Sequence, residues 1–389
     1  MKREYQDAVR SELEHVFGRS IVSSRDCMEL SNEIFQKTHK RLNPNTLRRF
    51  FGLVKTEYPS SHSTLNILSQ YCGFQSAEEV YKLTLTHSSG DLVEQANLVY
   101  YFISMFEEIT VMDSCDKTFF TIVEHTIKFL NKNLSLVDKF QSLVAKTRNG
   151  QDFYFEQLVN IDKFNFYFTN GLRYYLNEKR SGEGMIFAHS VFVFKYWLNK
   201  DDTKLAEHYN KMNKFSHNGS FNGYIYCRYY AAILFGAHTQ STPVEDILVS
   251  IYKFYSTLEA TGPADQLFYF EYTIAEALVL TGHYNDAQFY MDQFANRAKK
   301  KEFCKQRMSI QNIQLFRAVA FNKTGQVAEA LDIFNALKPA EFHFITKKYA
   351  AIFYIYLSTE LKRKIFRYDE SLESLINETG FCRLKSFCS

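Results

Sequence analysis

Apolar positions spaced as on one face of a helix recur along most of the chain. In residues 1–85 they predict five short helices. The first covers about Glu4–Phe17. The second begins near Asp26 and is expected to bury Met28, Leu30, Ile34 and Phe35. The third follows Asn43-Pro44, a good N-cap and first-turn pair. The fourth follows Pro59-Ser60-Ser61, and the fifth opens at the capping box Ser76–Glu79.

Residues 86–182 are expected to be helical but irregular. The segments Leu92–Val111 and Thr118–Leu130 predict a helical hairpin. A single aromatic helix is expected over Phe153–Leu176, after the break at Asn149-Gly150. This segment would link a small N-terminal domain (1–85) to a third region (183–389).

From residue 183 onward, pairs of helices repeat. The predicted pairs are Met185–Leu198 with Lys204–Phe215, Tyr224–Phe235 with Val244–Leu258, Leu267–Leu280 with Tyr284–Ala298, Ile310–Phe321 with Val327–Leu337, and Phe342–Lys362 with Glu370–Asn377. The loops inside the pairs recur about every 40 residues, which is typical of stacked helical units.

Composition supports an all-α fold. The 389 residues include only 15 Gly and 5 Pro, while 46% are hydrophobic. The start of the chain lacks the apolar core of a signal peptide, and the longest apolar stretches are too short to span a membrane. Seven scattered cysteines without a CxxC spacing argue against a disulfide scaffold or a zinc site. We therefore expect a cytoplasmic protein that does not contact a membrane.

Two of the repeated pairs carry a pattern of small residues. One has Ala275, Gly282 and Ala287, and the other has Ala318, Gly325 and Ala330, with equal spacing. This pattern resembles tetratricopeptide repeats, in which the alanines let two helices approach closely and the glycine reverses the chain. The resemblance implies a right-handed α-solenoid, although the units are longer than that repeat and another helical repeat remains open.

The N-terminal region has a local excess of positive charge. Between Ser31 and Phe74 there are six lysines and arginines but only two glutamates. The stretch Leu42–Gly52 resembles the middle of a helix-turn-helix of the phage-repressor-like class, in which the first turns of one helix face the major groove. That resemblance implies DNA contacts from Lys40, Arg41, Asn45, Thr46, Arg48, Arg49, Lys55, Ser60 and Ser61. The connection before Leu42 is longer than usual for the class, so a small helical domain with a solvated basic face is the alternative.

The sequence contains none of the catalytic or phosphate-binding motifs GxxxxGK[ST], GxGxxG, HExxH or GxSxG. Its histidines and paired acids are dispersed, and we expect no enzymatic activity and no cofactor. A ligand groove is expected on the concave side of the repeats, lined by Tyr226, Tyr229, Tyr269, Tyr272, Glu276, Asn312 and Asn322. The alternative is that these tyrosines only pack between helices.

The order of the two parts resembles peptide-sensing bacterial transcription regulators. The resemblance implies a homodimer, a palindromic site on duplex DNA, and a peptide or protein ligand held by the repeats. The competing hypothesis is a non-enzymatic interaction scaffold whose N-terminal domain does not bind DNA.

Overall fold

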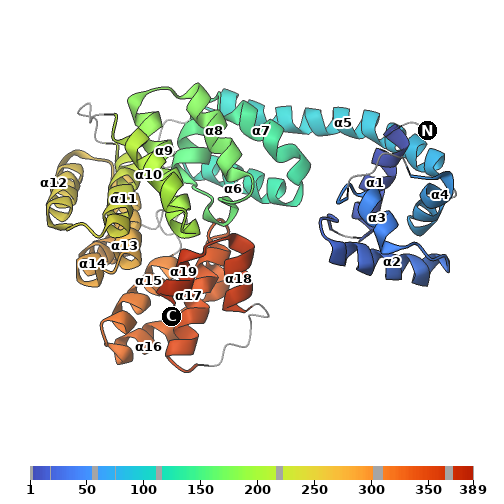
Figure 1. Cartoon of the computed structure of the whole chain (residues 1–389). Coiled ribbons are helices and arrows are strands. Elements are labelled where there is room, and N and C mark those ends of the chain that lie inside the picture. The colour runs from blue at the N-terminus through green and yellow to red at the C-terminus, as the bar shows by residue number, and fades with distance from the viewer. Residues whose placement is uncertain are drawn as a thin grey trace. The chain divides into compact units, whose positions relative to one another are not determined.

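A computed structural model describes residues 3–17, 19–54, 60–74, 76–110, 116–215, 222–300, 310–363 and 371–388. Every regular element among these residues is a helix (Figure 1). The chain forms two compact units, residues 1–98 and 99–389. The second unit therefore includes most of residues 86–182, the segment that we expected to be a separate linker. The first unit extends to residue 98, beyond the boundary expected at residue 85.

The first unit is built from α1 (Arg3–Phe17), α2 (Ser24–Thr38), α3 (Pro44–Phe50), α4 (His62–Tyr71) and the beginning of α5 (Ala77–Glu108). Helix α2 packs against α3 and α4, and α1 packs against α4. Their shared core includes Leu13, Leu30, Ile34, Leu47 and Leu68, all fully buried. Helix α5 continues past residue 92 as one helix, where two had been expected.

Caps in the first unit follow the local sequence. The Asn43 side chain accepts the backbone N–H of Asn45 ahead of Pro44, as the sequence predicts. Helix α3 stops at Gly52, whose φ of 74° places it in the left-handed region that glycine adopts readily. The N–H of Leu53 then reaches back to the carbonyl of Arg48 at 2.8 Å. Gly52 thus ends α3 after seven residues.

The expected inward positions of Met28 and Phe35 are wrong. Their side chains are 52% and 49% exposed. The buried stripe of α2 runs through Cys27, Leu30, Ser31 and Ile34. At 100° per residue, Met28 and Phe35 lie about a quarter turn away from that stripe.

The second unit begins with the end of α5, α6 (Lys117–Lys132), the 3₁₀ turn η1 (Leu134–Leu136) and α7 (Val137–Val144). A π-helical stretch, η2 (Gly150–Gln157), a 3₁₀ turn, η3 (Ile161–Lys163), and α8 (Phe168–Glu178) follow. The single helix expected over Phe153–Leu176 is therefore wrong. The backbone leaves the helix at residues 158–160, and Asp162 turns to cap another helix, α17 (Lys347–Glu360).

Five pairs of helices make up the rest. They are α9 (Gly182–Asn199) with α10 (Asp202–Met212), α11 (Gly223–Gln240) with α12 (Glu245–Thr261), α13 (Ala264–Leu280) with α14 (Tyr284–Lys300), α15 (Ile310–Lys323) with α16 (Val327–Ala336), and α17 with α18 (Leu372–Thr379). A 3₁₀ turn, η5 (Pro339–Glu341), precedes α17, and α19 (Arg383–Phe387) follows α18. The first helix of each pair packs against the first helix of the next (Figure 1).

All five first helices end in the same backbone motif. One or two positions after each helix lies a residue with positive φ, and these residues are Lys200, Ser241, Gly282, Gly325 and Lys362. In each case the next N–H bonds five residues back, as from His283 to Leu278 at 2.8 Å. From the residue numbers, successive stops are 41, 41, 43 and 37 residues apart. The repeat is thus more regular in backbone than in sequence, where only two stops are glycine.

The first helices surround a shared aromatic centre. Phe194 of α9 stacks on Phe235 of α11, with ring centroids 4.9 Å apart, and also meets Tyr349 of α17 at 6.3 Å. Phe316 of α15 joins Tyr349 and Tyr272. The first and last pairs therefore touch, and the C-terminal helix α19 returns to α9 through an Arg383 Nε bond to the Trp197 carbonyl. Among the described residues, no helix is both long enough and apolar enough to cross a membrane.

Candidate functional sites

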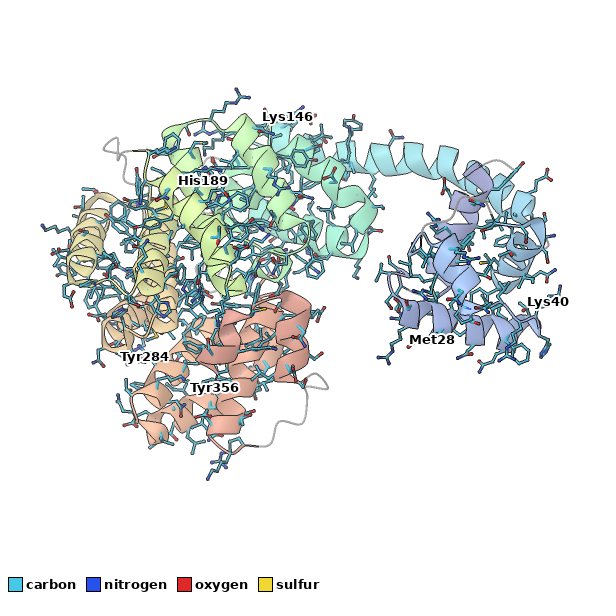
Figure 2. The ribbon with its side chains drawn as sticks, in the orientation of Figure 1. Met28, Lys40, Lys146, His189, Tyr284 and Tyr356 are labelled. Carbon is cyan, nitrogen blue, oxygen red and sulfur yellow. The ribbon has the colours of Figure 1, made fainter. Side chains whose placement is uncertain are left out.

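The junction of α2 and α3 carries a positively charged surface. Lys40, Arg41, Asn45 and Arg49 are exposed there, and Thr46 is half-buried. Lys40 lies on the outer surface of its unit (Figure 2) and donates to Gln70 Oε1 at 2.8 Å. We call Lys40, Arg41, Asn45 and Arg49 the basic surface.

Negative charge is scarce around the basic surface. Residues 31–54 contain five lysines and arginines but a single acid, Glu33. The carboxylate of Glu33 accepts the Tyr71 hydroxyl at 2.6 Å. Burial, together with this bond to Glu33, raises the pKa of Tyr71 far above its usual range. The tyrosine therefore stays neutral and adds no negative charge beside the basic surface.

Arg48 lies differently from its neighbours. Its side chain is half-buried, and its Nη1 donates to Asn45 Oδ1 at 3.2 Å, while its buried Nε has no hydrogen-bond partner in the part of the chain that the structure describes. The guanidinium folds along its own helix and holds the carboxamide of Asn45. Arg48 therefore positions Asn45 rather than extending freely from the surface.

The two serines expected to hold a phosphate are placed at the start of α4. Ser61 is its N-cap, and its hydroxyl accepts the Thr64 N–H at 3.2 Å. Ser60 is half-buried beside it. Lys55 lies outside the described residues.

The expected groove on the repeats is not an open surface. Tyr226, Tyr269, Tyr272, Glu276 and Asn312 are all at most 7% exposed. Tyr229 and Asn322 are half-buried. Because the first helices close around an aromatic centre, the side chains that we expected on a concave face lie in the interior instead.

Sequence reasoning missed the residue at the middle of this interior, Arg228 of α11. Its guanidinium is 5% exposed, donates to Tyr269 Oη at 3.1 Å and lies 3.7 Å from Glu276 Oε2. Burial raises the pKa of Glu276 to about 7, and the Arg228 charge opposes that shift. The signal was a lone charge within the apolar stretch Tyr224–Phe235.

A small cavity of about 40 Å³ lies beside Arg228, Tyr269, Tyr272 and Asn312. Its other wall runs from the end of η2 to the start of η3, where the lining residues Gln157, Leu158, Val159 and Ile161 are each at most 6% exposed. Asn312 Nδ2 donates to Thr346 Oγ1 at 2.8 Å. The chain's own segment thus covers three of the residues that were expected to contact a ligand.

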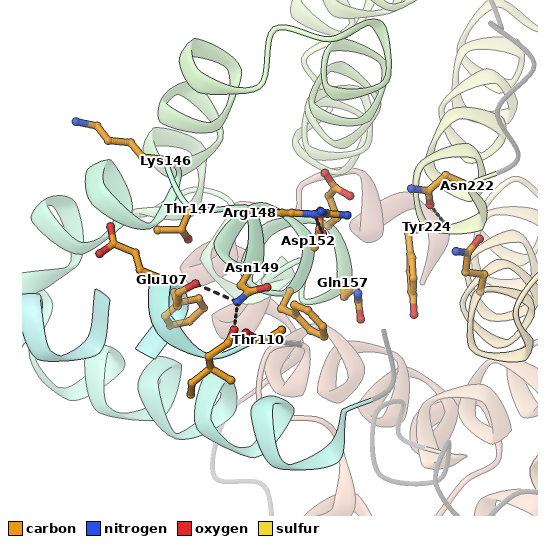
Figure 3. Close-up of a pocket in the computed structure, with 15 residues that line it drawn as sticks. Glu107, Thr110, Lys146, Thr147, Arg148, Asn149, Asp152, Gln157, Asn222 and Tyr224 are labelled. Atoms are coloured by element: carbon orange, nitrogen blue, oxygen red, sulfur yellow. Dashed lines mark hydrogen bonds and ion pairs between the residues drawn. The ribbon is translucent and has the colours of Figure 1, made fainter. Parts of the chain in front are cut away.

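A much larger cleft, of about 650 Å³, opens in the second unit (Figure 3). On one side are the end of α5, the turn after α7 and η2, and on the other are the first residues of α11 and α13. Its polar lining includes four carboxamides: Asn149, Gln157, Asn222 and Gln266. This volume is within the range of small-molecule sites.

Charged groups in the cleft are largely paired with each other. Asp152 lies 3.8 Å from Arg148 and 3.6 Å from Lys179, and Glu156 accepts from Lys179 at 2.5 Å. Burial raises the pKa of Glu156, against the attraction of Lys179. Lys146, Arg148 and Glu107 are exposed at its rim. Among the described residues, no three His, Cys, Asp or Glu side chains are grouped as a metal site.

Comparison with family models, curated proteins and solved structures finds no match for this chain.

Proposed function

We propose that the chain is a transcription regulator, in which the first unit binds duplex DNA and the second binds a peptide or protein ligand. The proposal that the first unit binds DNA rests on the basic surface at the junction of α2 and α3. Four exposed side chains able to bond phosphates or base edges are gathered there. Arginine and lysine neutralise phosphates, and arginine and asparagine also read guanine and adenine.

The pairing of α2 and α3 supports a helix-turn-helix interpretation. Five residues, 39–43, join the two helices, and Ser31 Oγ of α2 holds the connection by donating to the Leu42 carbonyl at 2.5 Å. Leu47 and Phe50 anchor α3 in the core, which leaves Asn45 and Arg49 facing outward. Under this proposal α3 faces the major groove.

We interpret the second unit as an α-solenoid of tetratricopeptide-like hairpins. The five shared backbone stops and the packing of successive first helices support this interpretation. The alanines Ala275, Ala287, Ala318 and Ala330 are all fully buried, as expected for small residues between closely packed helices. A homodimer completes the proposal, since two such heads would read a palindromic site.

The test is binding of the purified chain to fluorescent genomic DNA fragments at low salt. Arg41→Ala and Arg49→Ala should each weaken binding several-fold, because each removes a contact to phosphate or base. Arg25→Ala is the matched control, since Arg25 is 84% exposed on α2 but pairs with Glu29. If no fragment binds at low salt, or if all three variants bind equally, the proposal fails.

A protein-interaction scaffold is the second candidate, and one observation favours it. Met28 and Phe35 are half exposed, and their spacing of seven residues places them two helical turns apart on the same side of α2. Such a pair can contact another protein. In a pull-down from lysate, partners that persist after nuclease treatment and are lost in Phe35→Ser would favour the scaffold over the regulator.

A further inference from the structure

We propose that the large cleft of the second unit binds the main chain of a short extended peptide through its four carboxamides. This inference rests on the proposed ligand-binding role of that unit, and it places the ligand away from the buried interior where the sequence had placed it. A carboxamide carries both a donor and an acceptor, which matches the alternating N–H and C=O groups of a peptide backbone.

The strongest indication that the cleft binds a ligand is an unpaired oxygen of the Gln157 side chain. Its side chain is only 6% exposed, yet its Oε1 has no hydrogen-bond partner among the described residues. It lines the cleft, where Figure 3 shows its amide among the other lining side chains. A buried amide without a partner carries a desolvation penalty, and a ligand N–H would relieve it.

In each of the other three carboxamides, one of the two polar atoms is hydrogen-bonded to the backbone. Asn149 Nδ2 donates to the carbonyls of Phe106 and Ile109 at 3.0 and 2.9 Å, and its Oδ1 is not used in these bonds. Asn222 Oδ1 accepts the Tyr224 N–H, and Gln266 Oε1 accepts the Gly223 N–H at 2.7 Å. One side of the cleft therefore offers an acceptor, and the other offers the amide donors of Asn222 and Gln266.

The electrostatic surroundings fit a peptide with a free carboxylate. The first turns of α11 and α13, helices of 18 and 17 residues, border the cleft on the side of Asn222 and Gln266. Their positive dipole ends favour negative charge there. At the rim, Lys146 adds a cation and Glu107 an anion, while Arg148 and Lys179 pair with Asp152 and Glu156.

Gln157 also borders the 40 Å³ cavity beside Arg228. It is the last residue of η2, a π-helical stretch that leads directly into the buried residues 158–161. A ligand bonded to Gln157 would therefore contact the segment that fills the interior of the hairpin stack. This gives a direct structural route from an occupied cleft to the packing of α11, α13 and α15.

The probe is a pooled library of random heptapeptides, incubated with the full chain and recovered by ultrafiltration. We expect a subset of peptides to be retained, with affinity about tenfold lower in Gln157→Leu, the effect of losing one or two hydrogen bonds. Gln240→Leu is the matched control, because Gln240 is exposed at the end of α11 outside the cleft. Its affinity should equal that of the wild type.

A merely structural role for Gln157 predicts something else. If Gln157 only supports the fold, Gln157→Leu lowers the melting temperature. Under our proposal the melting temperature without peptide is unchanged or higher, because an unpaired buried amide is removed. Should that variant fold poorly, hydrogen exchange of the wild type decides, since the retained peptide must slow exchange at residues 149–157 and 222–224.

Three results would overturn the inference: no peptide retained above an unrelated control protein, equal retention by Gln157→Leu, or displacement of the peptides by RNA. DNA binding by the basic surface is measured separately and does not depend on the cleft. Peptide retention without DNA binding would refute the regulator and leave the cleft assignment standing, and the reverse result would do the opposite.

Discussion

Three of the five residues that end the first helices adopt the left-handed conformation in spite of their side chains. Lys200, Ser241 and Lys362 have φ between 52° and 59°, next to Gly282 and Gly325 with φ of 87° and 81°. A Cβ in that conformation costs roughly 1 kcal/mol. The surrounding helices must hold these turns, which is why the stop survives where the sequence does not signal it.

Substitutions at these helix ends should change the free energy of unfolding more at a glycine than at a lysine. Gly282→Ala should lower the free energy of unfolding by about 1 kcal/mol through backbone strain alone, since a Cβ there meets no atom within 4 Å. Lys200→Gly should change it by less, because relief of strain offsets the greater freedom of the unfolded chain. Urea unfolding of both variants measures this. Equal losses would show that side-chain contacts, not φ, fix the turns.

A pair of histidines joins α9 and α10. The Nδ1 atoms of His189 and His208 are 2.9 Å apart, so one ring donates to the other, and the two rings cannot both carry a positive charge. Burial lowers the pKa of both His189 and His208 to about 4. The unfolded chain therefore binds more protons than the folded one between about pH 4 and 6.5, and these histidines make stability fall as the pH drops through that window.

The variant His208→Gln isolates this effect. The difference in melting temperature between wild type and variant should shrink or reverse from pH 7.5 to pH 4.5, since only the wild type must keep both rings neutral. A pH-independent difference would contradict the neutral pair. Glu271 and Glu276, whose pKa values burial raises to about 7, act in the opposite direction and are present in both proteins.

At the level of elements, the break in the helix expected over Phe153–Leu176 shows that local sequence does not reveal contacts with distant parts of the chain. The carboxylate of Asp162 accepts the backbone N–H groups of Lys348 and Tyr349 at 2.8 and 3.0 Å, and so caps α17 from 186 residues away. No periodicity in Phe153–Leu176 signals that partner. Helix starts with a nearby cap, such as Asn43-Pro44, were by contrast readable, because cap and helix are neighbours in sequence.

Removal of this distant cap should be costly. Asp162→Ala is expected to lower the free energy of unfolding by about 2–4 kcal/mol, because it leaves two N–H groups of α17 unpaired in the interior. Asp162→Asn keeps one acceptor and should cost about half as much. Asp246→Ala, at an exposed site in the first turn of α12, is the control and should stay within about 0.5 kcal/mol. A small effect of Asp162→Ala in guanidinium unfolding would contradict the capping role.

The candidate sites likewise divide into those that local sequence predicts and those that depend on distant residues. The basic surface was readable, because Lys40, Arg41, Asn45 and Arg49 are close in sequence and exposed. The interior was not, because the burial of Tyr269, Tyr272 and Asn312 depends on residues 157–161, which lie more than 100 positions away. The cleft could not be predicted at all, since its four carboxamides come from three distant parts of the chain: the two ends of η2, the start of α11 and the start of α13.

On the scale of the whole second unit, the C-terminal residues close the stack of hairpins. Phe381 is fully buried against Tyr349, and Arg383 lies over the Trp197 ring at 5.1 Å while pairing with Asp202. These contacts join the last pair of helices to the first. The stability of the stack should therefore depend on residues near its end.

We expect Phe381→Ala to lower the free energy of unfolding by about 3–5 kcal/mol, the usual cost of a phenylalanine-sized cavity. Arg383→Ala should cost less, because its ion pair with Asp202 is partly exposed. Native-state hydrogen exchange should then show loss of protection in α9 as well as in α17. Protection lost in α17 and α18 alone would mean that the stack is not closed.

The central claim is that the basic surface contacts DNA phosphates, and the salt dependence of affinity tests it most directly. The measurement is the slope of log Kd against log salt concentration for one selected duplex, with wild type, the double variant Lys40→Ala/Arg41→Ala, and the control Arg25→Ala. Each phosphate contact contributes about 0.9 to the slope. The account predicts that the double variant loses about 1–2 from the slope and the control loses none. An unchanged slope in the double variant, or an equal loss in the control, would contradict it.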